Sequence, residues 1–366
     1  DVQPGRPAPP QLKPRDGAID VRVLPTESLG SPVKEYVVTL HPGEQKLRIP
    51  ANGTLEGTFR NLNNGVAYQA SVQAFNSSDK PSESSDLSAQ AIPFGKPGRV
   101  SNLSTTVVET DSHRAKIKVA WNYGDGNGRD VTGAHLVFGN GQSFDVRAPK
   151  SEATIEAPLG VPFWVEVQQV TEYGGSDPLR SKEITPYAKP PKPNAPQVET
   201  SGPQKVVVTG GSANPGGGFD GARLKLQLFD PARQQWVEYN GHRHELSGFE
   251  IGRPAEVQMR SYARAGAEIY ESQSVTATSP TNVYGKPSAP AVEVSATATG
   301  VDFIVDLQSG SNGVPVTVYY KGLGKIRTEL TGSTLTESGR PGETIKREFR
   351  SCDDQNNCSE WQTYSG

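Results

Sequence analysis

The chain has 366 residues, a hydrophobic fraction of 34% and a formal net charge of −3. At roughly 100–200 residues per domain, this length predicts two to four domains. The near-neutral charge excludes the basic excess by which proteins bind nucleic acid or an anionic membrane surface. No apolar run approaches the ~20 residues that a membrane-spanning helix needs. The chain starts at Asp1 with no signal peptide, and we interpret it as a fragment of a larger protein.

A proline-bounded motif recurs along the chain and is the first sign of repeats. An aromatic residue, a small residue, lysine and proline follow one another in Pro93-Phe94-Gly95-Lys96-Pro97, Pro186-Tyr187-Ala188-Lys189-Pro190 and Val283-Tyr284-Gly285-Lys286-Pro287, with a partial copy at Gly5-Arg6-Pro7. Proline fixes φ and cannot donate a ladder hydrogen bond. The motif therefore predicts joints between successive domains.

A second pattern runs in step with the first. A glycine precedes a stretch in which small or apolar residues alternate with polar ones, at Gly65, Gly160, Gly252 and Gly342. Alternation with a period of two predicts a strand with one buried face. Two independent markers with the same spacing predict four repeats of about 90 residues.

Each repeat also contains earlier short strands. They are predicted at 37–40, 117–121, 224–228 and 316–320, with glycine-rich turns such as 124–128 and 216–218 between strands. No window shows a sustained helical stripe of apolar residues. Several short strands in each ~90-residue unit predict a β-sandwich. We therefore expect an all-β chain with domains at 1–94, 95–187, 188–284 and 285–366.

The strand after each glycine resembles the F strand of fibronectin type III domains. The first repeat matches the family's pattern best, at Leu62, Gly65, Tyr68, Ala70, Val72, Ala74 and Asn76. The resemblance implies four tandem immunoglobulin-like, fibronectin type III β-sandwiches in an elongated array. It also implies that Tyr68 makes the family's corner hydrogen bond and that Trp121 is the core tryptophan of the B strand. Phe163 takes the place of the tyrosine in the second repeat and would be a core residue.

The joint motif and the C-terminal cysteine pair also resemble those of actinobacterial cell-surface arrays of fibronectin type III domains, bifidobacterial ones among them. This resemblance implies an extracellular or cell-surface location. It implies adhesion or contact with other proteins rather than catalysis.

Cys352 and Cys358 are the only cysteines, and both fall in the predicted F–G loop of the fourth repeat. A disulfide there would close a short loop and contribute roughly 2 kcal/mol in the chain-entropy model. The alternative is a metal or redox pair. Zinc needs about four ligands, however, and no other Cys or His lies near in sequence. We expect the disulfide, and with it an oxidising compartment.

Two segments offer weak metal-site patterns. His242 and His244 fall on one face of a strand and could begin a metal site. No third ligand is visible, so we favour a solvated strand face. The segment 125–130 has oxygen-bearing residues at odd positions, but it lacks the bidentate Glu of a calcium loop and includes Arg129. We interpret it as a B–C turn and expect neither a metal nor a cofactor.

The sequence carries no catalytic pattern. The nucleophile elbow, the phosphate-binding glycine loop and the His-Glu-x-x-His zinc motif are all absent from it. A sandwich of about 90 residues also lacks a deep cleft in which to raise a carboxylate pKa. We therefore expect that the chain is not an enzyme.

Aromatic residues are the remaining candidates for binding. We expect Trp164 to face outward, Trp236 and Tyr239 to lie on a polar strand, and Tyr173 to lie in an F–G loop. Tyr and Trp on a rigid scaffold are typical anchors for protein partners. The alternative is that such residues pack against a neighbouring domain at the proline-rich joints.

The sequence favours a non-enzymatic extracellular protein-binding or adhesion array, with a host or cell-envelope protein as its partner. Matrix and immune signalling proteins are among the expected partners, and a glycan is the other ligand class considered. Neither nucleic acid nor direct membrane insertion is expected. Two alternatives stay open: a rigid stalk that presents another domain, and an accessory module of a secreted polysaccharide-degrading enzyme.

Overall fold

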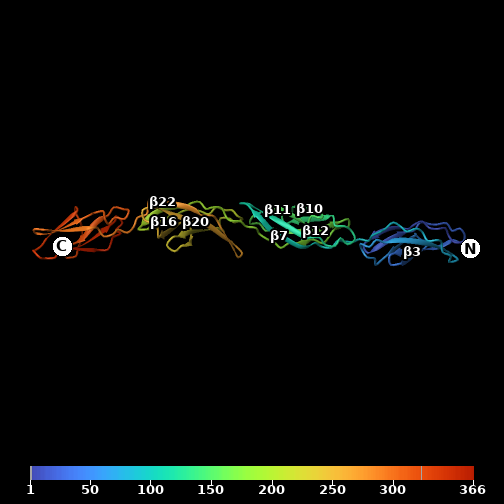
Figure 1. Cartoon of the computed structure of the whole chain (residues 1–366). Helices are drawn as coiled ribbons and strands as arrows, with labels where there is room; N and C mark the ends of the chain where they lie inside the picture. The colour runs from blue at the N-terminus through green and yellow to red at the C-terminus, as the bar shows by residue number, and fades with distance from the viewer. Residues whose placement is uncertain (1, 323) are drawn as a thin grey trace. The chain divides into compact units, whose positions relative to one another are not determined.

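The computed structural model describes residues 2–322 and 324–366 of the chain, and every regular element in this part is a β-strand (Figure 1). Contacts within the chain group it into two compact units. The first consists of Asp1–Thr110 and Arg114–Pro186, and the second of Asp111–His113 and Tyr187–Gly366. Each unit contains two successive repeats, apart from the short segment Asp111–His113.

The first repeat folds into two three-stranded antiparallel sheets. The order is β1-β2-β5 in one sheet and β4-β3-β6 in the other. The strands are β1 (Gln11–Arg15), β2 (Ala18–Arg22), β3 (Val33–His41), β4 (Gln45–Pro50), β5 (Glu56–Phe59) and β6 (Gln69–Asn76).

The second repeat has the same plan with additional short strands. The sheets are β11-β8-β7 and β10-β9-β12-β13, and β14 also pairs with β12. Figure 1 labels β7, β10, β11 and β12 of this repeat. The strands are β7 (Ser101–Thr110), β8 (Arg114–Asn122), β9 (Gly133–Phe138), β10 (Ser143–Arg147), β11 (Glu152–Pro158), β12 (Val165–Thr171), β13 (Gly174–Gly175) and β14 (Leu179–Arg180).

The third repeat follows the second closely. Its sheets are β15-β16-β19 and β18-β17-β20-β21, with β22 also paired to β20. The strands are β15 (Gln197–Gly202), β16 (Lys205–Thr209), β17 (Lys225–Asp230), β18 (Gln235–Tyr239), β19 (Arg243–Ser247), β20 (Pro254–Ala265), β21 (Glu268–Glu271) and β22 (Val275–Asn282).

The fourth repeat pairs a three-stranded sheet with a four-stranded one. Their orders are β23-β24-β27 and β26-β25-β28-β29. The strands are β23 (Val292–Thr297), β24 (Gly300–Val305), β25 (Thr317–Lys321), β26 (Arg327–Glu329), β27 (Thr334–Ser338), β28 (Lys346–Cys352) and β29 (Gln362–Ser365).

This repeated strand order confirms the predicted all-β architecture of tandem sandwiches of the fibronectin type III kind. Every sheet lies inside one of the four predicted domain ranges, although the domain limits themselves stay predictions. Along β6, buried residues alternate strictly with partly exposed ones. The alternation follows from the period of two, which places every second side chain between the sheets.

A separate apolar core fills each sandwich. Trp121 and Phe163 are buried in the second repeat, and Phe303 and Phe349 in the fourth. Tyr68 is buried in the first repeat, and the Asn63 amide donates to its hydroxyl oxygen (3.1 Å). That bond fixes the corner that leads into β6, because it ties the aromatic ring to the preceding loop.

The last segment of the first repeat runs beside β6 in an unusual way. The buried side chains of Ser82, Ser85 and Ser88 accept hydrogen bonds of 2.9 Å from β6. The donors are every second backbone amide along the free edge of this strand. The backbone amides of the same serines donate to β6 carbonyls. Because the serines recur every three residues and their β6 partners every two, each step accommodates one extra residue, as a β-bulge does. We call this arrangement the serine ladder.

Parts of the serine ladder recur in the other repeats. Ser176, Ser272 and Ser359 each accept a hydrogen bond from an amide of the neighbouring F strand, at 3.1, 2.9 and 3.1 Å. These hydroxyls satisfy buried backbone donors that would otherwise be left without a partner at the sheet edge.

A substitution within the serine ladder should weaken the first repeat locally. Ser85→Ala removes the acceptor of the buried Val72 amide, and an unsatisfied buried donor costs about 1–3 kcal/mol. We expect roughly tenfold faster hydrogen exchange at the Val72 amide. Ser84→Ala, at the exposed neighbouring position, is the matched control. Equal exchange rates in the two variants would contradict the role of the hydroxyl.

Candidate interaction sites

The linker between the first and second repeats is bound by the loop between β8 and β9. The Gly95 amide donates to the Asn127 carbonyl (3.0 Å), and the Asn127 side-chain amide donates to the Lys96 carbonyl (2.9 Å). Gly128 follows with φ of +101°, and a Cβ atom there would overlap the Pro93 carbonyl oxygen. The segment 125–130, interpreted as a B–C turn, is therefore the part of the second repeat that receives the linker.

The same contact recurs within the second unit. The Gly285 amide donates to the Asn312 carbonyl (2.8 Å), and the Asn312 side chain donates to the Lys286 carbonyl (3.3 Å). Gly313 has φ of +96° and packs against Tyr284. At the third copy, the Ala188 amide donates to the Gly217 carbonyl (2.9 Å). We call this contact between the proline-bounded motif and the next B–C loop the linker dock.

An ion pair ties the motif, or its partial copy, to the repeat that follows it in three places. The basic residue of the motif meets an acidic residue that directly follows a ladder serine: Arg6 with Asp86 at 2.7 Å, Lys96 with Asp177, and Lys286 with Glu360 at 3.8 Å. In the third repeat Gln273 takes the acidic position. All of these pairs are exposed, so each adds little stability and weakens with salt.

Within the first unit, further contacts join the two repeats themselves. The Asn64 side chain of the first repeat donates to the Asn127 side-chain oxygen of the second (2.9 Å). The Arg129 guanidinium donates to the Ile92 carbonyl (2.9 Å) and lies 3.8 Å above the Phe94 ring. Tyr173 meets Phe94 edge to face at 6.5 Å between ring centroids. Tyr173, although 48% exposed, therefore belongs to the joint.

The other aromatic candidates are only partly available to a partner. Trp164 is partly exposed next to the buried Phe163, but Arg180 lies 3.7 Å above its ring. Arg260 lies 4.2 Å above the ring of Trp236, which also contacts Phe229.

The expectation for Tyr239 is wrong, because this side chain is 6% exposed and belongs to the core. Its hydroxyl donates to the Gly210 carbonyl (2.8 Å), and burial raises its pKa. Trp236 and Tyr239 lie three residues apart, so the period of two turns them to opposite faces of β18.

The predicted disulfide is confirmed: Cys352 and Cys358 are bonded. The Asp353 carboxylate accepts hydrogen bonds from the Gln355 and Asn357 amides inside the loop (3.1 and 2.8 Å). Burial raises the pKa of Tyr284 in the preceding linker, and the charges of Asp353 and Asp354 add to this shift. Lys286 of that linker pairs with Glu360, two residues after Cys358, so the closed F–G loop lies close to the linker that enters the fourth repeat.

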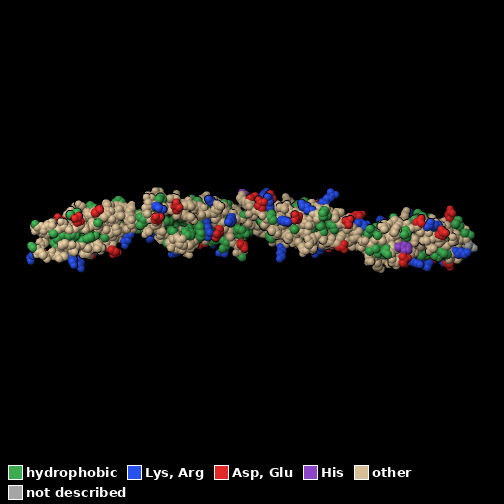
Figure 2. Space-filling view, viewed as in Figure 1, with side chains coloured by type: hydrophobic (Ala, Val, Ile, Leu, Met, Phe, Trp, Pro, Cys, Tyr) green, Lys and Arg blue, Asp and Glu red, His purple; other side chains and the backbone are tan. Residues whose placement is uncertain are grey.

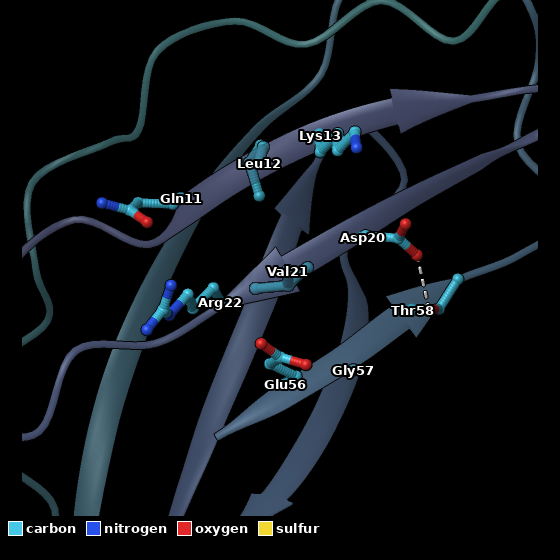
Figure 3. Close-up of a pocket in the computed structure, with 9 residues that line it drawn as sticks. All are labelled: Gln11, Leu12, Lys13, Asp20, Val21, Arg22, Glu56, Gly57 and Thr58. Atoms are coloured by element: carbon cyan, nitrogen blue, oxygen red, sulfur yellow. Dashed lines mark hydrogen bonds between the residues drawn. The ribbon is translucent and has the colours of Figure 1, made fainter. Parts of the chain in front are cut away.

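A shallow hollow lies on the outer face of β1-β2-β5 (Figure 3). Asp20 accepts hydrogen bonds from Arg15 and Thr58, and these bonds lower its pKa. Arg22 and Glu56 face each other on neighbouring strands. This is a solvated face of mixed charge, and it lacks the enclosure that a binding pocket for a small molecule requires.

Other classes of site find no support in the part of the chain that the structure describes. Within residues 2–322 and 324–366, no group of three or more His, Cys, Asp or Glu side chains is arranged to hold a metal ion. His244 instead packs edge to face on Tyr239. No helix among the described residues could cross a membrane. In Figure 2, basic and acidic side chains are interspersed over the visible face.

Comparison with known proteins finds likenesses among solved structures. No family model matches the chain. A solved structure of the chicken CNTN1 FN1–FN3 domains is similar at 14% identity, over 75% of this chain and 99% of that one, with a TM-score of 0.27. The fold described above rests on the strand order of the sheets rather than on this likeness.

The linker dock predicts a measurable shift in one carboxyl group. The hydrogen bond and charge of Lys96 hold the pKa of Asp177 below its ordinary value, so the pair stabilises the fold at neutral pH and is lost as pH falls through that lowered pKa. Lys96→Gln should raise the Asp177 pKa towards its ordinary value. Carboxyl NMR titration measures it, with Lys182→Gln as control. An unchanged midpoint would show that the pair does not persist in solution.

The disulfide predicts a loss of stability confined to the fourth repeat. Replacing both Cys352 and Cys358 by Ser should lower the free energy of unfolding of this repeat by about 2 kcal/mol, because a short closed loop opens in the unfolded chain. Hydrogen exchange, resolved by repeat, measures the change. The first repeat serves as the internal reference, and equal losses in both repeats would argue against this account.

Proposed function

We propose that this chain is a non-enzymatic spacer of an extracellular protein, in which the linker docks hold successive sandwiches in defined orientations within each unit. The observation that carries the proposal is the recurrence of one contact. At three successive motifs, a linker amide donates to the carbonyl of a loop residue directly before a glycine with positive φ. Flexible joints between domains would not require such a recurring contact.

The position of the linker docks also argues against adhesion through the B–C loops. In this type of sandwich, loops at one end are the usual binding elements. Here the B–C loops at Asn127, Gly217 and Asn312 bind linkers, and Tyr173 in an F–G loop packs on Phe94. These loops are engaged in contacts within the chain, which supports a spacer over binding through these loop tips.

Two further features support an extracellular, non-catalytic role. The disulfide is typical of proteins from oxidising compartments. The hollow on the first repeat is shallow and polar, and its Asp20 carboxyl has a lowered rather than a raised pKa. A general acid would need the opposite shift. Attachment to a bacterial cell surface and contact with host or envelope proteins remain part of the proposal.

The spacer proposal is tested at the first joint in the full chain. Spin labels at Lys46→Cys and Thr106→Cys, which are exposed positions in successive repeats, should give one narrow distance distribution by pulsed electron paramagnetic resonance. Gly128→Ala should broaden it, because the added Cβ overlaps the Pro93 carbonyl oxygen.

The matched control for this experiment is Gly141→Ala. Gly141 also has a positive φ, of +85°, but nothing lies within 4 Å of an added Cβ. The two alanines therefore share the backbone strain of a positive φ, and only Gly128→Ala disturbs the linker dock. A broad distribution in the parent chain would reject the spacer proposal.

A further inference from the structure

The outer face of the β26-β25-β28-β29 sheet combines aromatic rings with cations. Arg327 lies 3.7 Å above the Tyr319 ring, and Arg350 and Lys321 lie 4.5 and 4.6 Å from the centre of the Trp361 ring. Val318 and Phe349 are buried on the inner face, so their sequence neighbours on β25 and β28 face outward. We call Tyr319, Lys321, Arg327, Arg350 and Trp361 the fourth-repeat cluster.

The charges of this cluster are only partly balanced. Lys321 pairs with Glu348 at 3.2 Å. Within the described residues, neither Arg327 nor Arg350 has a carboxylate within ion-pair distance, and the buried Arg350 Nε has no hydrogen-bond partner. Among the described residues, the hydrogen bonds of Arg327 are all long: to the Asn356 side-chain oxygen at 3.4 and 3.5 Å, and to Cys352 Sγ at 3.7 Å.

The third repeat provides a matched comparison. Arg260 occupies the position of Arg350, eight residues after the glycine that precedes the F strand. It also lies over a tryptophan, but it donates to Gln227 at 3.0 Å and to the Glu271 carboxylate at 2.8 Å. The arginine of this stack is thus neutralised in the third repeat, whereas in the fourth Arg350 has no carboxylate partner among the described residues and its Nε makes no hydrogen bond. If the stack of arginine on tryptophan served only to stabilise the fold, we would expect the arginine to have a carboxylate partner in both repeats.

We propose that the fourth-repeat cluster binds an acidic segment of a partner protein, with carboxylates of the partner on Arg327 and Arg350. Guanidinium groups form bidentate hydrogen bonds with carboxylates. Tyr319 is paired with Arg350 in the strand register and lies beneath Arg327, so both arginines start from the outer face of the same sheet. Arginine and aromatic residues together are the commonest energetic centres of protein interfaces.

Two neighbouring features favour a peptide over a uniform polyanion. Glu329 is paired in register with Tyr319, and Glu348 with Lys321. These carboxylates would repel a sulfated glycan or nucleic acid that carries charge along its whole length. In addition, Ile326, next to Arg327, is 69% exposed and offers apolar contact to a side chain. A segment that alternates acidic and apolar residues fits both features.

The test uses the full chain and a displayed library of random dodecapeptides. Selected peptides should be enriched in Asp and Glu. A synthetic copy of the best binder should lose about tenfold or more in affinity for Arg350→Gln and for Arg327→Gln, since each removes a charged partner. Its affinity should also fall as salt rises. Arg260→Gln is the matched control and should bind as the parent does.

Other outcomes overturn the proposal. Absence of binders, binders without acidic enrichment, or binding insensitive to both substitutions would each reject it. Tighter binding of a heparin oligosaccharide that Arg327→Gln abolishes would assign the face to sulfated glycans. Self-association in sedimentation that Arg327→Gln abolishes would assign it to a second copy of the chain. Arg327 is exposed, so its variant still tests the face if Arg350→Gln fails to fold.

Discussion

The hydrogen bond from a linker amide to a B–C loop carbonyl is the constraint on which the arrangement within each unit depends. It requires close approach of two backbones, and this is why a glycine with positive φ follows the accepting residue at Gly128, Gly218 and Gly313. A Cβ atom at Gly128 would overlap the Pro93 carbonyl oxygen, and one at Gly313 would make a tight contact with Tyr284 of the linker. The prolines of the motif reinforce the contact, because they restrict the linker before it binds and so reduce the entropy lost on docking.

The serine ladder provides hydrogen-bond acceptors for the edge of β6 in the segment that precedes the linker. Segment 82–88 must lead from the edge of one sheet towards the next joint, and a regular strand would place every second residue between the sheets. By using serine hydroxyls as acceptors for β6 amides, the chain advances three residues for every two of its neighbour and leaves few buried donors unsatisfied. The residues between the serines stay exposed, and one of them, Asp86, pairs with Arg6 of the partial motif at the start of the first repeat.

Function on this scaffold follows from which surfaces the joints leave free. The linker docks occupy the B–C loops. A partner protein would therefore have to bind a sheet face. On the second and third repeats, cations cover Trp164 and Trp236. On the fourth, Arg350 covers Trp361, and its Nε has no hydrogen-bond partner among the residues that the structure describes. A spacer with one recognition face would unite both proposals, since a rigid support limits the entropy lost when a partner binds.

Much of this protein could be predicted from its sequence, because the relevant signals are local. Period-two alternation predicted the F strands, the spacing of Pro and Gly predicted the repeats, and a pair of cysteines six residues apart predicted the disulfide. The period of two along β18 could also have shown that Trp236 and Tyr239 cannot both face outward. Asn127-Gly128 and Asn312-Gly313 recur in step with the linker motif, and this signal could have identified the linker dock. The tertiary structure alone decided which loop carbonyl receives each linker, and that Arg260 has a carboxylate partner whereas Arg350 has none within the described residues. These outcomes depend on the register between strands distant in sequence, which no local pattern specifies.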